Sequence, residues 1–190
     1  MKFTSKEIFT ISNGISLLRF LLVIPFWFLL DHFDSQSVRY ITFFLCLFAA
    51  ATDMLDGYLA RKLNQVTEVG KIIDPLADKT AMALIVIKLY LIGEISDFYF
   101  YSIILRDILI FSGGIYVTSK IGKVLPSNKL GKITVLNIGF VILLIIIGFS
   151  RNHFIYQFFY YSSIILIFAS FIAYVIRAKE FIAKKNNESI

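Results

Sequence analysis

The chain has 190 residues, of which 58% are hydrophobic and only 17% are charged, and it contains 20 Phe and 10 Tyr. An average soluble domain is about 45–50% apolar and about 25% charged, so this composition excludes a disordered chain, a coiled coil and most soluble enzymes. At about 20 residues per membrane-spanning helix, six spans would use roughly 120 residues and leave about 70 for loops and ends. The composition therefore predicts an all-α integral membrane protein without a sizeable domain outside the lipid.

Six apolar runs separated by short polar links predict six transmembrane helices. They are expected at residues 14–31, 39–60, 72–93, 98–118, 133–150 and 156–176. Before the first run, Thr4 and Glu7 have the spacing of a capping box, and residues 4–11 fit either a short interfacial helix or a frayed terminus. The expected organisation is one membrane-embedded domain over residues 1–190. Within it we expect the possible interfacial helix at 1–12, a six-helix bundle at 13–178 and a cytoplasmic tail at 179–190.

The basic residues are distributed unevenly over the two predicted sides of the membrane. Fourteen of the 19 Lys and Arg fall on one side, namely Lys2, Lys6, Arg61, Lys62, Lys71, Lys79, Lys120, Lys123, Lys129, Lys132, Arg177, Lys179, Lys184 and Lys185. The other side has only Arg39 and Arg151. Basic residues accumulate on the cytoplasmic side of membrane proteins, so both termini are expected in the cytoplasm. This bias also accounts for the net charge of +6 without a nucleic-acid partner.

Four aspartates lie where the membrane disfavours charge. Asp53 and Asp56 lie near the cytoplasmic end of the second predicted span, and Asp74 and Asp78 lie at the start of the third. A charge inside a membrane helix costs a few kcal/mol and needs a partner. Residues spaced i, i+3 or i, i+4 share a helix face, so two adjacent helices would turn the four carboxylates toward one another. Their mutual repulsion calls for cations, and ligand sets made of oxygen alone select Mg²⁺, Mn²⁺ or Ca²⁺.

Three of the four aspartates also have a simpler structural interpretation. Asp74 precedes Pro75 and could cap the third helix, while Asp53 and Asp56 could pair with Arg61 or Lys79. These interpretations account for single residues but not for all four at this spacing and depth. The metal site is therefore the preferred hypothesis. The nearby basic residues indicate that a phosphate-bearing ligand completes it.

The pattern around these aspartates resembles the signature of the CDP-alcohol phosphatidyltransferases, D-x2-D-G-x2-A-R-x8-G-x3-D-x3-D. All eight fixed positions match, as Asp53, Asp56, Gly57, Ala60, Arg61, Gly70, Asp74 and Asp78. A second stretch, formed by Asn13, Ser16, Arg19 and Pro25, is similar to the N-x2-[ST]-x2-R-x5-P start of bacterial phosphatidylglycerophosphate synthases. The resemblance extends over essentially the whole chain.

The resemblance implies a fold, a reaction and a set of site residues. The fold would be a six-helix bundle, usually a homodimer, in the bacterial cytoplasmic membrane with its active site facing the cytoplasm. The enzyme would transfer a phosphatidyl group from CDP-diacylglycerol to an alcohol and release CMP. Two divalent ions, Mg²⁺ or Mn²⁺, would be held by Asp53, Asp56, Asp74 and Asp78, with Asp78 also acting as general base. The CDP group would be bound by Gly57, Ala60, Arg61 and Gly70.

The alcohol acceptor is expected to be glycerol 3-phosphate, giving phosphatidylglycerophosphate. Candidate residues for binding its phosphate are Arg106, Lys132, Lys129, Arg19 and Asn13. Phosphatidylglycerophosphate synthases carry a second Arg eight residues after the position of Arg106, where this chain has Gly114. The pair Arg106-Asp107 is instead similar to cardiolipin synthases of the same family, so phosphatidylglycerol stays open as the alternative acceptor.

Two hypotheses from other classes are less consistent with the sequence. Intramembrane prenyltransferases also combine Asp-rich motifs with Mg²⁺ and a lipid diphosphate, but they resemble larger bundles of about nine spans. At about 20 residues per span these would use roughly 180 of the 190 residues and leave almost none for loops and ends. A cation transporter with an acidic site would have its carboxylates nearer the membrane midplane. The transporter hypothesis would also give no role to Gly57, Ala60, Arg61 and Gly70.

Overall fold

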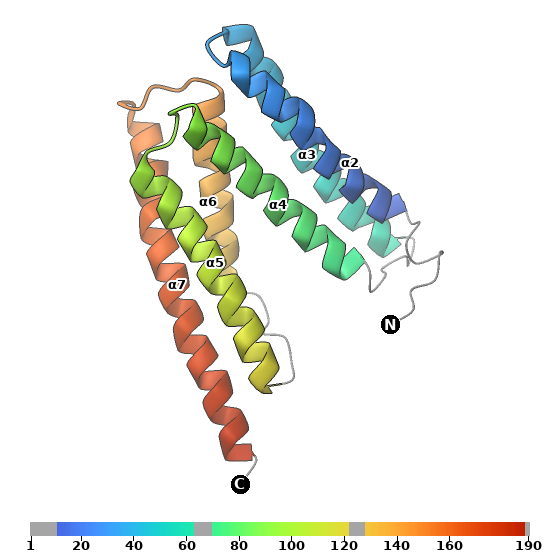
Figure 1. Ribbon diagram of the computed structural model, residues 1–190, viewed down its shortest axis with the longest axis vertical. Helices are drawn as coiled ribbons and strands as arrows, with labels where there is room; N and C mark the ends of the chain where they lie inside the picture. The colour runs from blue at the N-terminus through green and yellow to red at the C-terminus, as the bar shows by residue number, and fades with distance from the viewer. Residues whose placement is uncertain (1–10, 63–69, 122–127, 189–190) are drawn as a thin grey trace. The chain divides into compact units, whose positions relative to one another are not determined.

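The computed structural model describes residues 11–62, 70–121 and 128–188, with the backbone alone at 53–62, 70–78, most of 11–20, 121, 184 and 186–188. These residues form six α-helices and one short 3-10 helix (Figure 1). The elements are α2 (Ile11–Leu29), η1 (Leu30–His32), α3 (Gln36–Lys62), α4 (Gly70–Leu91), α5 (Asp97–Ile121), α6 (Lys129–Ile146) and α7 (Phe154–Glu188). Within these ranges the prediction of an all-helical fold is confirmed, whereas the interfacial helix proposed for residues 4–11 falls almost entirely outside them.

Each of the six predicted spans corresponds to one observed helix, and the differences lie at the helix ends. Helix α7 continues to Glu188, well past the predicted end at residue 176. The residues that follow include Arg177, Lys179 and Glu180, which end the apolar run but are good helix formers. Helix α6 begins at Lys129 instead of residue 133, because Asn128 Oδ1 accepts a hydrogen bond of 3.1 Å from the backbone N–H of Leu130 and caps the helix.

Three of the helices are long and apolar enough to cross a membrane. They are Asp97–Lys120, Lys129–Ile146 and Phe154–Ala183, and two shorter apolar segments occur at Leu21–His32 and Gln36–Thr52. Many large apolar side chains on these helices are exposed, among them Leu136 on α6 and Ile165 on α7. Surfaces of this kind suit contact with lipid, so the chain is an integral membrane protein.

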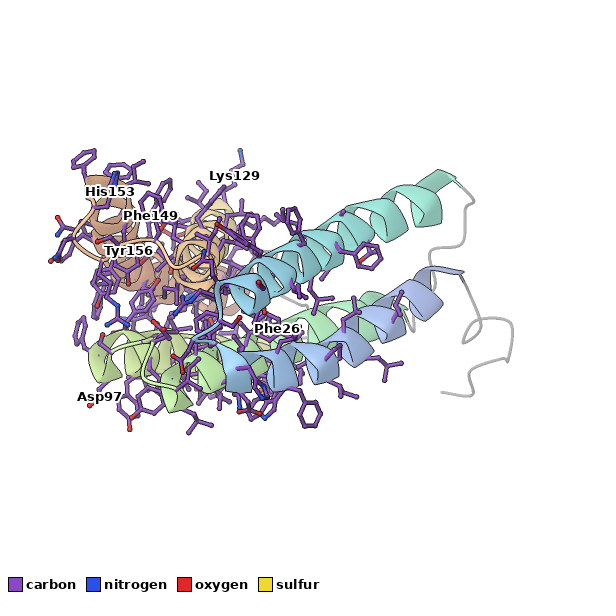
Figure 2. The ribbon with its side chains drawn as sticks, turned by 90° about the horizontal axis from the view of Figure 1, so that it is seen from above. Phe26, Asp97, Lys129, Phe149, His153 and Tyr156 are labelled. Carbon is purple, nitrogen blue, oxygen red and sulfur yellow. The ribbon has the colours of Figure 1, made fainter. Side chains whose placement is uncertain are left out.

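The chain divides into two compact units, the first made of Met1–Ile95 with Ile146–Gly148 and the second of Ser96–Ile145 with Phe149–Ile190. In the first unit, α2 packs against both α3 and α4. Its buried positions Val23 and Phe26, together with Leu30 at the start of η1, follow the spacing of one helix face, and Figure 2 labels Phe26 on α2. The C-terminal end of α3 and the N-terminal end of α4 lie at the same end of this unit as the start of α2 (Figure 1).

Ion pairs hold the other end of the first unit together. The ammonium group of Lys88, near the end of α4, pairs with Asp31 of η1 and lies 4.8 Å from the centre of the Trp27 ring. Arg39 Nη2 and Glu94 Oε1 are 3.0 Å apart and join the start of α3 to the turn after α4. The pairing with Asp31 balances the charge of Lys88, which would otherwise be costly in a membrane helix.

The second unit is organised around α5 and α7, which run side by side in the same direction (Figure 1). Three hydrogen-bonded pairs between α7 and the segment formed by Ser96 and α5 have partners that are 64 residues apart along the chain. The pairs are Ser96–Tyr160 at 3.2 Å, Tyr99–Ser163 at 2.8 Å and Arg106–Ser170 at 3.3 Å. The last two pairs are seven residues apart on both helices, which is the repeat of parallel helices that pack along one seam.

Small residues and one lysine continue this seam toward the C-terminal ends of both helices. A Cβ atom added to Gly113 would come within 3.1 Å of Tyr174 Cε1, so glycine lets α7 approach α5 closely here. Further along, Lys185 Nζ donates a hydrogen bond of 2.6 Å to the backbone carbonyl of Lys120, near the end of α5. The C-terminal extension of α7 is therefore fastened to α5.

Helix α6 completes the second unit through polar contacts with α7. Thr134 Oγ1 donates a hydrogen bond of 3.2 Å to the carbonyl of Leu166, and Asn137 Nδ2 donates one of 3.0 Å to Ser162 Oγ. The turn between α6 and α7 contains an edge-to-face contact of 4.7 Å between the rings of Phe149 and His153 (Figure 2).

Candidate functional site

The four aspartates of the predicted metal site occupy helical positions in the first unit. Asp53 and Asp56 lie within α3, and Asp74 and Asp78 lie within α4. Helical geometry keeps the members of each pair on one face of their helix. Because α4 begins at Gly70, Asp74 lies inside the helix, and the interpretation of Asp74 as its N-terminal cap is wrong.

The chemistry of this donor set fits a hard divalent cation. All four side chains supply carboxylate oxygens, and residues 53–78 contain no His or Cys. The structure describes only the backbone at these four aspartates, so the metal site remains a prediction. Elsewhere, the described side chains include no group of three or more His, Cys, Asp or Glu that could hold a metal ion.

The predicted CDP-binding residues belong to the same end of the first unit. Gly57, Ala60 and Arg61 lie in the last turns of α3, and Gly70 is the first residue of α4. Among the acceptor candidates, Asn13 and Arg19 lie in the N-terminal half of α2, which packs against both of these helices. The side chains of all these residues lie outside the described part, so their roles stay predictions.

Arg106 on α5 is the predicted acceptor residue whose surroundings are described most fully. Its side chain is buried, with an exposed fraction of 8% for the residue. Its Nε donates to Ser170 Oγ at 3.3 Å, and its Nη1 lies 2.6 Å from Oδ1 of the neighbouring, half-exposed Asp107. A buried guanidinium in a membrane-spanning helix marks a candidate functional group, since such a charge is costly.

The first turn of α6 lies against the Arg106 guanidinium. A Cβ atom added to Gly131 would come within 3.3 Å of Arg106 Nη2, so glycine permits this close approach. Lys129 and Lys132 in the same turn are exposed, and Figure 2 labels Lys129. A helix N-terminus attracts anions through its free N–H groups and its dipole. Arg106, the two lysines and this helix end outweigh the single carboxylate of Asp107, so together they form an electropositive site in the second unit.

Gly114 is the position at which the sequence departs from the phosphatidylglycerophosphate synthase pattern. A Cβ atom added there would come within 3.3 Å of the Tyr174 hydroxyl oxygen. That hydroxyl is buried and has no hydrogen-bond partner among the described residues. A tyrosine from α7 thus lies over the position where the resemblance described above leads us to expect a second Arg.

The sequence does not predict that Ser170, Gly131 and Tyr174 lie beside these candidate residues. Gly131 is found between Lys129 and Lys132, the two residues of this turn that the sequence predicts as acceptor ligands. Ser163 and Ser170 are small polar residues seven apart in an apolar run, and this spacing is the signal that indicates a buried polar seam.

The chain is similar to known proteins over most of its length. A family model described as CDP-alcohol phosphatidyltransferase matches residues 9–176. A relative from Aquifex aeolicus is 37% identical over 131 residues, which cover 66% of this chain and 69% of the relative. One from Rickettsia typhi is 30% identical over 136 residues, covering 72% of this chain and 76% of the relative. Both relatives are named CDP-diacylglycerol–glycerol-3-phosphate 3-phosphatidyltransferase.

Proposed function

Because this chain belongs to the CDP-alcohol phosphatidyltransferase family, we propose that it transfers a phosphatidyl group from CDP-diacylglycerol to glycerol 3-phosphate. The products are phosphatidylglycerophosphate and CMP. The names of the relatives support this choice of acceptor. The acyl chains of the donor stay in the lipid around the apolar helices, while its nucleotide meets a soluble acceptor at the membrane surface.

The contact of Arg106 with the first turn of α6 is the main observation that supports an acceptor with a phosphate group. Nε and Nη1 of Arg106 are held by Ser170 and Asp107, so Nη2 is the group that remains for a charge-assisted hydrogen bond to a phosphate. The helix N-terminus adds favourable N–H groups. In this proposal Arg106 binds the phosphate directly, with Lys132 and Lys129 attracting it through their exposed ammonium groups. Asn13 and Arg19 contribute from α2.

The reaction centre consists of the four aspartates. Asp53, Asp56, Asp74 and Asp78 hold two divalent ions, Mg²⁺ or Mn²⁺. When bound, such ions withdraw negative charge from a diphosphate and stabilise the departing CMP. The Asp78 carboxylate takes the proton from the acceptor hydroxyl as the new bond to the β-phosphorus forms and the bond between that phosphorus and CMP breaks.

The nucleotide is held by residues beside these aspartates. Gly57 and Gly70 allow the backbone to approach the diphosphate closely, and Ala60 leaves room for the nucleotide. Arg61 binds a phosphate oxygen pair or stacks on the base. This division of roles leaves the electropositive site around Arg106 for the acceptor.

The proposed arrangement in the membrane has six spans, both termini in the cytoplasm and an active site that faces the cytoplasm. The distribution of basic residues supports this orientation. We further propose that the whole chain is one catalytic domain, that two copies form a homodimer and that the host membrane is the bacterial cytoplasmic membrane. Cysteine labelling of single residues in the loops after α2 and α3, from either side of the membrane, tests the orientation.

An acceptor panel tests the function. The purified protein receives CDP-diacylglycerol, Mg²⁺ or Mn²⁺, and one acceptor at a time from glycerol 3-phosphate, phosphatidylglycerol, serine, inositol and inositol phosphate. We expect CMP release and phosphatidylglycerophosphate with glycerol 3-phosphate alone. Cardiolipin formed from phosphatidylglycerol would assign the alternative acceptor. If no acceptor caused CMP release, the phosphatidyltransferase proposal would be wrong.

Arg106→Ala tests the acceptor site itself. We expect the KM for glycerol 3-phosphate to rise by about two orders of magnitude, since a charge-assisted contact with phosphate is lost. The KM for CDP-diacylglycerol should stay within about twofold of the wild-type value. An equal rise in both KM values would remove Arg106 from the acceptor site.

A further inference from the structure

We propose that Ser170 of α7 is a positioning residue that fixes the orientation of the Arg106 guanidinium for binding the acceptor phosphate. The inference rests on the proposed function, because it assumes that Arg106 binds the acceptor. It concerns a residue outside the family signature, on a different helix from Arg106. Its basis is the hydrogen bonding between the two side chains and the burial of both.

Ser170 is placed to act as a hydrogen-bond acceptor toward Arg106. The residue is 1% exposed, so water does not compete for its hydroxyl. Its Oγ donates its own proton to the carbonyl oxygen of Ile167 at 3.0 Å. The remaining lone pairs of Oγ are therefore available to Arg106 Nε, which lies at 3.3 Å.

This bond decides which N–H groups of Arg106 remain for a ligand. A guanidinium is planar and has five N–H donors in a fixed arrangement. When Nε is held by Ser170, the plane can no longer turn freely about the side chain's long axis. Nη1 then reaches Asp107, and Nη2 lies beside Gly131 in the first turn of α6. Nη2 is thus directed to the helix N-terminus, where an anion is favoured.

A purely structural role for Ser170 is less consistent with its surroundings. The seam between α5 and α7 already has a shorter hydrogen bond, 2.8 Å between Tyr99 and Ser163, one heptad earlier. That pair joins two neutral groups, whereas Ser170 contacts a charged one. Burying a charge to join two helices costs more than a neutral pair would, so the charge at Arg106 needs another purpose.

The test compares two buried serines of the same seam. Ser163→Ala is the matched control, because Ser163 is also fully buried on α7 and also hydrogen-bonds to α5. We expect Ser170→Ala to raise the KM for glycerol 3-phosphate about tenfold, a change of about 1.4 kcal/mol, and to leave the KM for CDP-diacylglycerol unchanged. Ser163→Ala should lower the melting temperature to a similar extent but change neither KM. Ser170→Thr, which retains a hydroxyl, should restore acceptor binding.

A double substitution separates this inference from the proposed function. If Arg106→Ala leaves the KM for glycerol 3-phosphate unchanged, the proposed acceptor site is wrong. If Arg106→Ala raises this KM but Ser170→Ala behaves like Ser163→Ala, the proposed function stands and the positioning role is wrong. In the Arg106→Ala background, Ser170→Ala should add nothing, and a further tenfold rise would overturn the inference.

Ser170→Cys provides a second test if the alanine variant does not fold. Cysteine nearly preserves the side-chain volume, but its sulfur is a weak hydrogen-bond acceptor. We therefore expect the same selective rise in the KM for glycerol 3-phosphate. An unchanged KM in a folded Ser170→Cys protein would show that the hydrogen bond to Arg106 does not orient the guanidinium.

Discussion

The ion pair between Asp31 and Lys88 gives a prediction about stability that does not depend on the reaction. The side chain of Lys88 is 8% exposed and that of Asp31 is 48% exposed. Asp31→Asn leaves the ammonium group buried without its countercharge. Breaking a fully buried pair costs about 3–5 kcal/mol, whereas an exposed pair contributes about 0–1 kcal/mol. For a pair exposed on one side only, we expect a loss of about 2 kcal/mol.

The loss is measurable as a shift in thermal unfolding. A change of 1 kcal/mol lowers the melting temperature of a chain of this size by about 2–4 °C, so Asp31→Asn should lower it by about 4–8 °C. Unfolding of the purified protein in detergent can be followed by far-ultraviolet circular dichroism, because the described residues are almost entirely helical. Asp34→Asn, a substitution of an exposed aspartate three residues later, is the matched control and should shift the melting temperature by less than about 1 °C.

A second substitution distinguishes lost pairing from lost packing. Lys88→Met combined with Asp31→Asn removes both charges and keeps an unbranched apolar side chain next to Trp27. Replacing a buried pair with apolar groups is often neutral, so most of the lost stability should return. If the double variant melts at the same temperature as Asp31→Asn or lower, the buried ammonium is not the cause of the instability.

Three further predictions concern the metal site, the base and the seam between α5 and α7. A chelator should stop CMP release, and Mg²⁺ or Mn²⁺ should restore it; release that continues with the chelator would exclude the metal hypothesis. Asp78→Asn should lower turnover at least about 100-fold while part of the metal-dependent binding of CDP-diacylglycerol survives, and near-normal turnover would remove Asp78 from the role of base. Gly113→Ala should lower the melting temperature by about 2–4 °C, because the new methyl group comes within 3.1 Å of the Tyr174 ring. Gly14→Ala is its control, because apart from its chain neighbours and its own helix backbone no described atom lies within 4 Å of the new methyl group there. Equal shifts in both variants would show that the contact with Tyr174 is not the cause.

The positions of the six helices could be predicted from the sequence because apolar runs of about 20 residues are a strong signal. Their ends could not, because they depend on other forces. Helix α6 begins at its Asn128 cap, and α7 continues through charged residues that favour helix as much as apolar ones do. Hydropathy locates the part of a helix that suits lipid, and it does not indicate where the backbone hydrogen bonding stops.

The aspartate motif and the site around Arg106 were predictable to different extents. The aspartates and glycines form a continuous motif, so the family was identifiable from these residues, and the family model confirms it. The acceptor site depends on contacts between helices that are far apart in the sequence. Nothing near Arg106 in the chain indicates Ser170, which lies 64 residues later, or the closeness of Gly131. Such pairings follow from the packing of α5 with α6 and α7.

The pairs Tyr99–Ser163 and Arg106–Ser170 share a separation of 64 residues, and this limits where α5 and α7 can change in length. Deleting one residue between Tyr99 and Arg106 would rotate the rest of α5 by about 100° and carry the guanidinium away from its serine. Compensation would require a deletion at the matching place in α7. We therefore expect a change of length between Ile146 and Phe154 to leave this register intact, whereas the interiors of the two helices have to keep it.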